Sequence, residues 1–166
     1  MACRGVHFAL SPEDRDRVLA CESDEDLVRL ISEEIEEEYM ASKEWCVETD
    51  KAWDAIHRCL AAGYLIPEDG PYPRSYCILG GRELHKGTNY IVSLVTADQA
   101  AELYPALESV TAEWMRNRYF ALDDEDYAVP LTEEDFEYTW AYFEDLPAFF
   151  RKAALAGRSV IFTVDQ

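Results

Sequence analysis

The chain has 166 residues, about the length of one domain, and a domain of this size buries roughly 70% of the surface that its unfolded chain exposes. Hydrophobic residues make up 49% of it and aromatic residues 13%, which excludes an intrinsically disordered chain. Fifteen Lys and Arg residues stand against thirty-four Asp and Glu residues, so the net charge is −19. A phosphate backbone or an anionic membrane would repel such a chain, and we expect neither nucleic acid nor a membrane as partner.

The first third of the chain is expected to hold one strand and two helices. Residues 6–10 alternate weakly, as in a short strand, and Ser11 followed by Pro12 is typical of a helix N-terminus. This first helix should reach about Ala20, and Ser23 is the next N-cap. Apolar side chains then recur at helical spacing: Leu27, Leu30, Ile31, Ile35 and Tyr39. The pattern predicts an amphipathic helix that packs on one side.

The middle third is expected to hold one helix and two strands. The helix covers about residues 50–62, with Thr49 as its cap and Gly63 as its stop. Residues 75–79 are predicted to form a strand that ends in a Gly-Gly turn, where a positive φ is needed. Residues 90–95 give the clearest signal of a buried strand.

Helices dominate the rest of the chain. Thr96 caps a helix that Pro105 can interrupt, residues 110–121 form another helix, and residues 123–126 form an acidic loop.

A final helix and strand close the chain. Thr132 begins the helix, with Asp135 placed to reach back as in a capping box, and Pro147 must kink the helix or restart it. Gly157 ends it, and residues 159–164 form a closing strand. Helices and strands alternate irregularly, which predicts an α/β fold, with α+β as the alternative. The expected architecture is a single compact domain over residues 1–166, with a mixed β-sheet covered by helices.

The acidity belongs to two segments. Residues 22–50 hold twelve acidic and two basic residues, and residues 123–145 hold ten acidic residues and no basic one. Both segments can be solvated helix faces that keep the protein soluble, or docking surfaces for a basic partner. The candidate partner-binding residues are Glu33, Glu36, Glu37, Glu134 and Glu137.

Compartment and cofactor signals are few. The N-terminal residues show no secretory signal, and no apolar run approaches 18 residues, so we expect a cytoplasmic protein. Five cysteines without a Cys-x-x-Cys pair argue against a disulfide framework and against a zinc site. The three histidines form no metal-binding motif. The sequence therefore predicts no metal and no cofactor.

One constellation could carry chemistry. Asp50, Trp53, Asp54 and His57 lie on adjoining rows of a helix, so a carboxylate can sit one turn from an imidazole. A carboxylate that orients a histidine is the usual arrangement of a general base, which makes His57, Asp50 and Asp54 the catalytic candidates. Trp53 and Lys51 are the matching ligand-binding candidates. His57 also belongs to the apolar stripe of this helix, where a hydrogen-bonded core histidine is the alternative.

The same residues carry a resemblance to a known family. The segment Asp50-Lys51-Ala52-Trp53, with His57 four residues after the Trp, resembles the signature of the YfbM-like family, a bacterial domain of unknown function. The opening residues 5–13, the Gly-Gly at 80–81 and the ending at 142–164 are similar in order and spacing. Residues 86–90 depart from the Gly-Tyr-Gly-like element that members often carry there. The resemblance implies a three-layer α/β/α domain and no particular activity.

Two hypotheses about function follow. The first is a non-enzymatic interaction module, of inhibitor or immunity type, that docks a basic protein through its acidic helices. The second is an enzyme or small-molecule binder with a site around Asp50, Trp53 and His57.

Overall fold

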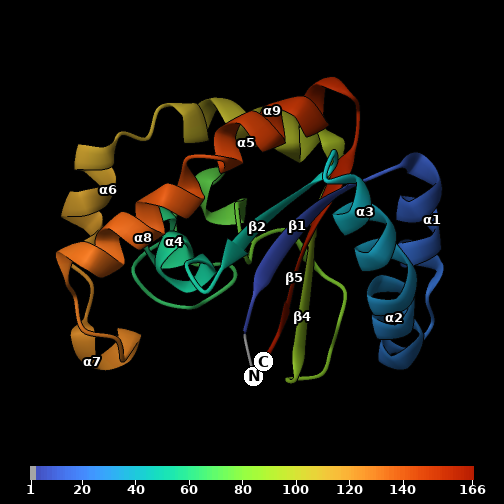
Figure 1. The fold of residues 1–166 in the computed structure, drawn as a ribbon, viewed down its shortest axis with the longest axis horizontal. Coiled ribbons are helices and arrows are strands. Elements are labelled where there is room, and N and C mark those ends of the chain that lie inside the picture. The colour runs from blue at the N-terminus through green and yellow to red at the C-terminus, as the bar shows by residue number, and fades with distance from the viewer. Residues whose placement is uncertain (1–2) are drawn as a thin grey trace.

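A five-stranded sheet forms the centre of the computed structural model, which describes residues 3–166 (Figure 1). The strands lie in the order β2-β1-β5-β4-β3, and each neighbouring pair is antiparallel. The expected sheet is therefore present, but it is antiparallel where a mixed sheet was predicted. The physical reason is that the helical connections before β2 and β5 return the chain to the end of the sheet that it left. The strands are β1 (Gly5–Leu10), β2 (Cys46–Asp50), β3 (Arg82–Glu83), β4 (Tyr90–Val95) and β5 (Ser159–Asp165).

Helices cover both faces of this sheet, so that the molecule has three layers (Figure 1). Successive side chains of a strand point to opposite faces, and each strand therefore contributes to two cores. Phe8 and Ile161 pack with α1 to α3, whereas Ala9 and Phe162 pack with α4 to α9. The α/β class and the three-layer arrangement are confirmed. The helices of the first layer are α1 (Pro12–Ala20), α2 (Asp24–Leu30) and α3 (Glu36–Ser42). Those of the other layer are α4 (Trp53–Leu60), α5 (Ala97–Glu108), α6 (Ala112–Tyr119), α7 (Asp124–Tyr127), α8 (Glu133–Phe143) and α9 (Leu146–Leu155).

A π-helical turn, η1 (Ile31–Ile35), joins α2 to α3 in one continuous rod. The buried side chains of the rod are spaced by four residues: Leu27, Ile31, Ile35 and Tyr39. At 3.6 residues per turn, each step of four drifts by about 40°, so three steps would carry the stripe about 120° away from the sheet. The wider π turn, with its i→i+5 hydrogen bonds, absorbs part of this drift and keeps the stripe in the core.

The predicted start of the helix at residues 50–62 is wrong, because β2 occupies that position. Thr49 does not cap a helix: its side chain is buried, and its hydroxyl donates to the carbonyl of Gly5 at 3.2 Å. Asp50 ends the strand with φ of 43°, and α4 begins only at Trp53. The hydrogen bonds of β2 to β1 outweigh the local helix signal, and this is the kind of long-range pairing that a local pattern does not show.

The strand predicted at residues 75–79 is also wrong. A 3₁₀ turn, η2 (Arg74–Tyr76), stands there, and Cys77, Ile78 and Leu79 fill the core without pairing to a strand of the sheet. Their apolar run signals burial, which a strand and a buried turn share. Gly81 has φ of +85°, as expected for the turn after it.

In the later part of the chain, the predicted helix caps are present, but one of the two predicted proline interruptions is not. Pro105 stays inside α5, whereas Pro147 restarts the chain as α9. Residues 123–126, predicted as a loop, mostly form the short helix α7. Thr132 caps α8 as predicted, but the Asp135 side chain turns to two tyrosine hydroxyls instead of completing a capping box.

Candidate functional site

The exposed carboxylates of η1 and α3 form what we call the acidic face, defined by Glu33, Glu34, Glu37 and Glu38. Glu34 is paired with Arg17 of α1. Within residues 3–166, the other three carboxylates make no ion pair. Successive members four residues apart, such as Glu33 and Glu37, repel one another by about 0.2–0.5 kcal/mol. The acidic face is thus a surface whose charge the rest of the chain leaves largely uncompensated.

Glu36, which was predicted to bind a partner together with Glu33 and Glu37, points inward instead. It is half-buried and accepts a hydrogen bond from the Tyr90 hydroxyl at 3.3 Å. Burial raises the pKa of this carboxyl, and Asp165 adds to the effect. Glu36 also lines a cavity of about 420 Å³ between the helical rod and the end of the sheet. It is therefore separated from the exposed pair Glu33 and Glu37.

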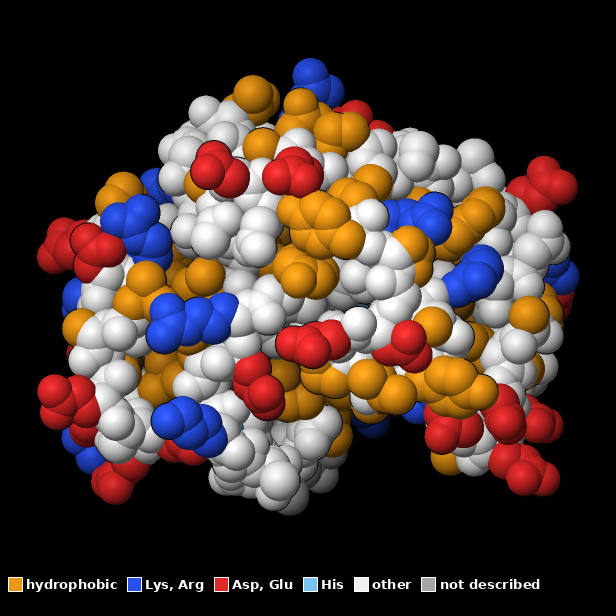
Figure 2. Space-filling view, turned by 180° about the vertical axis from the view of Figure 1, so that it is seen from behind, with side chains coloured by type: hydrophobic (Ala, Val, Ile, Leu, Met, Phe, Trp, Pro, Cys, Tyr) orange, Lys and Arg blue, Asp and Glu red, His pale blue; other side chains and the backbone are white. Residues whose placement is uncertain are grey.

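The second acidic segment uses much of its charge internally. Asp126 pairs with Arg58, and Glu133 pairs with Arg116. Glu134 and Glu137 remain exposed and make no ion pair within the described part of the chain. Helices α7 and α8 lie at the opposite end of the molecule from α2 and α3 (Figure 1). Seen from behind, the acidic side chains over α7 form a separate group at the lower right (Figure 2).

The predicted ligand-binding residues lie together at the start of α4. Lys51, Trp53 and Asp54 line a cavity of about 550 Å³, which we call the tyrosine cleft, and the opposite wall comes from α7 and α8. The residues of that wall are Tyr127, Val129, Asp135 and Tyr138. Trp53 is 4% exposed, and its indole Nε1–H donates to the carbonyl of Cys3 at 3.0 Å. The indole is thus a fixed part of the wall.

Tyrosine hydroxyls and carboxylates are paired along this cleft. Tyr138 donates to Oδ2 of Asp50 at 2.7 Å, and Tyr119 and Tyr127 both donate to Oδ2 of Asp135, at 2.6 Å and 2.9 Å. Burial, together with the Asp50 carboxylate, raises the pKa of Tyr138 to about 12. Burial and the Asp135 carboxylate likewise raise the pKa values of Tyr119 and Tyr127. All three phenols therefore stay protonated at neutral pH and act as donors.

Asp54 binds an arginine and not a tyrosine. Its Oδ1 accepts a 2.5 Å hydrogen bond from Nε of Arg58, whose side chain also pairs with Asp126 of α7. Burial raises the pKa of the Asp54 carboxyl, and the bond to Arg58 opposes that rise. Arg58 is 5% exposed, whereas the Asp126 side chain is 48% exposed, so a buried guanidinium joins α4 to a carboxylate of α7 at the protein surface.

His57 lies in the core behind the cleft. It is 1% exposed, and its Nε2–H donates to the carbonyl of Ile66 at 2.9 Å. Burial lowers the pKa of the imidazole, which is therefore neutral. Asp50 pairs with Tyr138 and Arg4, and Asp54 pairs with Arg58, so the predicted carboxylate–histidine pair is not formed.

Several polar residues in the interior were not predicted from the sequence. His7 on β1 is fully buried, bonds through Nε2 to the Cys77 carbonyl at 2.8 Å, and packs against the ring of Phe162. Burial lowers the pKa of His7 to about 4. A histidine in the apolar pattern of residues 6–10 is a visible signal for such a site. The hydrogen bond between Tyr127 and Asp135 has no comparable signal in the sequence, because it depends on how α7 turns back toward α8.

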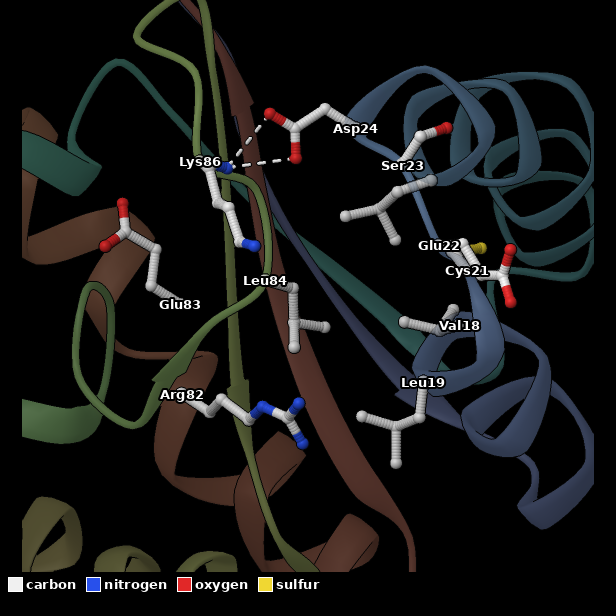
Figure 3. A pocket seen from close by; sticks show the side chains of 11 residues that line it. Val18, Leu19, Cys21, Glu22, Ser23, Asp24, Arg82, Glu83, Leu84 and Lys86 are labelled. Carbon is white, nitrogen blue, oxygen red and sulfur yellow. Dashed lines mark hydrogen bonds between the residues drawn. The ribbon is translucent and has the colours of Figure 1, made fainter.

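A further groove lies beside the edge strand β3. It measures about 430 Å³, and Figure 3 shows Leu84 facing Val18 and Leu19 across it. Both oxygens of the Asp24 carboxylate accept from the backbone N–H of Lys86, at 3.1 Å and 3.2 Å. This bonding holds the pKa of the Asp24 carboxyl below its usual range. Asp24 thereby closes one end of the groove.

The part of the chain that the structure describes holds neither a metal-binding cluster nor a membrane-spanning helix. Across residues 3–166, His, Cys, Asp and Glu side chains nowhere gather in threes as a metal site would need. No helix in the same range combines the length and the apolar character required to cross a bilayer.

Comparison with known proteins identifies the family of this chain and a solved structure with a similar fold. The model of a family described as "Domain of unknown function (DUF1877)" matches residues 1–163. The chain belongs to this family. The crystal structure of YfbM from Escherichia coli, a protein of unknown function, aligns with a TM-score of 0.65 at 17% identity, over 97% of this chain and 99% of that chain. The likeness shows the fold, and the YfbM-like resemblance is confirmed. No curated protein matches.

Membership of the DUF1877 family brings no reaction with it. The residues that carried the resemblance have separate positions in the fold: Asp50 ends β2, Lys51 is exposed, Trp53 walls the cleft and His57 lies in the core. The features of this chain that bear on function are therefore the acidic face and the tyrosine cleft.

Proposed function

We propose that this protein is a non-enzymatic interaction module of the bacterial cytoplasm, of inhibitor or immunity type, that docks a basic partner on its acidic face. One observation carries the proposal: Glu33, Glu37 and Glu38 are exposed and make no ion pair within residues 3–166. A basic partner would supply the missing cations. Charge complementarity of this kind raises association rates and selects partners.

The acidic face also costs the free protein stability. Two pairs of like charges stand four residues apart, Glu33 with Glu37 and Glu34 with Glu38, and each costs about 0.2–0.5 kcal/mol. Glu37 and Glu38 lie toward the C-terminal end of the rod, where the helix dipole disfavours negative charge. A π-helical turn inside the same face is a second unusual feature, and such turns are frequent at functional sites.

The distance between the two acidic segments limits which of them one partner can contact. Glu134 and Glu137 belong to α8, at the far end of the molecule from the acidic face (Figure 1). A small partner is not expected to contact both ends at once. The proposal therefore rests on the acidic face alone, and Glu134 and Glu137 are not expected to contact the same partner.

A capture experiment tests this proposal. Tagged wild-type protein and two charge-matched variants are incubated with native bacterial lysate at low and high salt. The first variant carries Glu33→Gln, Glu37→Gln and Glu38→Gln; the control carries Glu125→Gln, Glu134→Gln and Glu137→Gln. We expect a basic protein that wild type and control retain at low salt, and that the first variant loses. Retention of the same proteins by all three chains would contradict the proposal.

The alternative of an enzyme or small-molecule binder around Asp50, Trp53 and His57 keeps one supporting feature. The tyrosine cleft brings Trp53 beside Lys51 and Asp54. His57 is hydrogen-bonded to the backbone behind this cleft, which gives no support to a catalytic base. The alternative is thus better described as ligand binding in the cleft.

A further inference from the structure

The tyrosine cleft has the size and the walls of a small-molecule site. Its volume of about 550 Å³ falls within the usual range for ligand pockets, which is roughly 300–1,000 Å³. Trp53, Leu65 and Val129 supply apolar surface, and Tyr127 and Tyr138 supply aromatic rings. Such sites combine apolar walls with a few polar groups that set the orientation of the ligand.

The polar groups of the cleft can accept hydrogen bonds that the protein does not supply. Asp135 uses Oδ2 for both of its tyrosine partners, and its Oδ1 has no hydrogen-bond partner within residues 3–166. In the described part of the chain, Asp54 accepts its side-chain hydrogen bond through Oδ1, from Arg58, and its Oδ2 has no partner. The hydroxyl hydrogens of Tyr127 and Tyr138 already point to carboxylates. A ligand that donates would therefore fit better than one that accepts.

The charges that line the cleft also favour a ligand that donates hydrogen bonds. The lining includes the carboxylates of Asp54 and Asp135 and one cation, Lys51, whose side chain is exposed. Tyr127 already contacts one cation, since the guanidinium carbon of Arg58 lies 5.6 Å from its ring centroid. Tyrosine and tryptophan rings attract cations through their electron-rich faces.

We propose that the tyrosine cleft binds a small organic cation, a primary amine on a short apolar body. Its ammonium bonds to Oδ1 of Asp135, and its body packs against Trp53 and Val129. Asp54 adds negative charge from the neighbouring wall. This site is independent of the docking of a basic protein on the acidic face.

Benzylamine is a suitable probe, with benzyl alcohol as its neutral counterpart and phenylacetate as an anionic one. Binding is followed by NMR shifts of backbone amides at moderate salt. We expect benzylamine to move the amides of Lys51, Asp54, Tyr127 and Val129 with a Kd of about 1 mM, in line with a ligand of this size. Benzyl alcohol should bind at least about tenfold more weakly, because it lacks the charge that Asp135 attracts.

Two variants separate this site from the general field of a protein with net charge −19. Asp135→Asn should weaken benzylamine about tenfold, whereas Glu134→Gln, the same charge change one residue away and outside the cleft, should leave it unchanged. Val129→Trp should block the cleft from a position that is 40% exposed, and it keeps the Asp135 hydrogen bonds.

Several results would overturn the proposal: equal binding of benzyl alcohol, tighter binding of phenylacetate, an equal loss in Glu134→Gln, or amide shifts confined to α2 and α3. The triple variant of the acidic face should bind benzylamine as wild type does. Failure of the docking proposal and failure of the cleft proposal are thus distinguishable.

Discussion

The hydroxyl of Tyr138 in α8 donates a 2.7 Å hydrogen bond to Asp50 at the end of β2. The two residues are 88 positions apart in the chain, and the backbone N–H of Lys51 donates to the same hydroxyl at 3.3 Å. One phenol thus joins the helical layer to the edge of the sheet and fixes one wall of the tyrosine cleft.

Loss of this hydroxyl should destabilise the protein measurably. We expect Tyr138→Phe to lower the free energy of unfolding by about 1–2 kcal/mol, because a hydrogen bond to a carboxylate is lost. Tyr142→Phe is the matched control, since the Tyr142 ring packs edge-on against Tyr138, with ring centroids 5.0 Å apart, but its hydroxyl makes no side-chain hydrogen bond within residues 3–166. Urea unfolding compares the two variants, and equal losses would contradict the assigned role of the bond.

Buried His7 should make stability depend on pH below neutrality. Its pKa is about 4 in the folded protein and about 6.5 in the unfolded chain, so the unfolded chain binds the proton first as the pH falls. The free energy of unfolding should therefore decrease between pH 6.5 and pH 4, by up to about 3 kcal/mol from this residue.

A His7→Leu variant isolates that contribution. It loses the bond to the Cys77 carbonyl at every pH, so it should be less stable near neutrality. Its stability should nevertheless fall less steeply than that of wild type between pH 6.5 and pH 4. Urea unfolding at several pH values gives both slopes, and parallel curves would rule out His7 as the titrating group.

Arg58 should be among the most sensitive charged residues. Its buried guanidinium pairs with both Asp54 and Asp126, and its removal leaves the Asp54 carboxyl without its cation. We expect Arg58→Met to lower the free energy of unfolding by about 3 kcal/mol. Arg15→Met breaks only an exposed pair with Asp16 and should cost less than about 1 kcal/mol. A smaller loss for Arg58 than for Arg15 would contradict this assignment.

Sequence patterns were informative where a local interaction decides the structure. Ser11, Ser23, Thr96 and Thr132 all accept a backbone N–H at a helix start, as their spacing predicted. The strands at residues 6–10, 90–95 and 159–164 were visible because they are buried on both faces. Each of these predictions depends only on residues that are close together in the sequence.

The errors concern contacts between distant residues. Thr49 has the chemistry of a cap, but its hydroxyl bonds to Gly5 across the strand pair. Asp135 stands at the correct position for a capping box, but Tyr119 and Tyr127 engage its carboxylate. The candidate site was therefore predictable in part: Trp53, Lys51 and Asp54 were named. The opposite wall comes from α7, α8 and the segment between them, and the position of these elements against α4 depends on contacts between residues distant in the chain.

The repulsion on the acidic face should be measurable in the free protein. Glu33→Gln with Glu37→Gln removes one pair of like charges four residues apart, and we expect it to raise the free energy of unfolding by about 0.5 kcal/mol. Glu13→Gln with Glu113→Gln makes the same charge change at two exposed positions on α1 and α6, at opposite ends of the molecule (Figure 1), and should have a smaller effect. Equal effects would show that only net charge matters.

The affinity of the purified captured partner tests the docking claim most directly. Isothermal titration at two salt concentrations compares wild type with the Glu33→Gln, Glu37→Gln, Glu38→Gln variant and with the matched variant at residues 125, 134 and 137. We expect the acidic-face variant to bind about tenfold more weakly and with a smaller dependence on salt, while the matched variant binds as wild type does. Equal affinities of wild type and the acidic-face variant would contradict the claim.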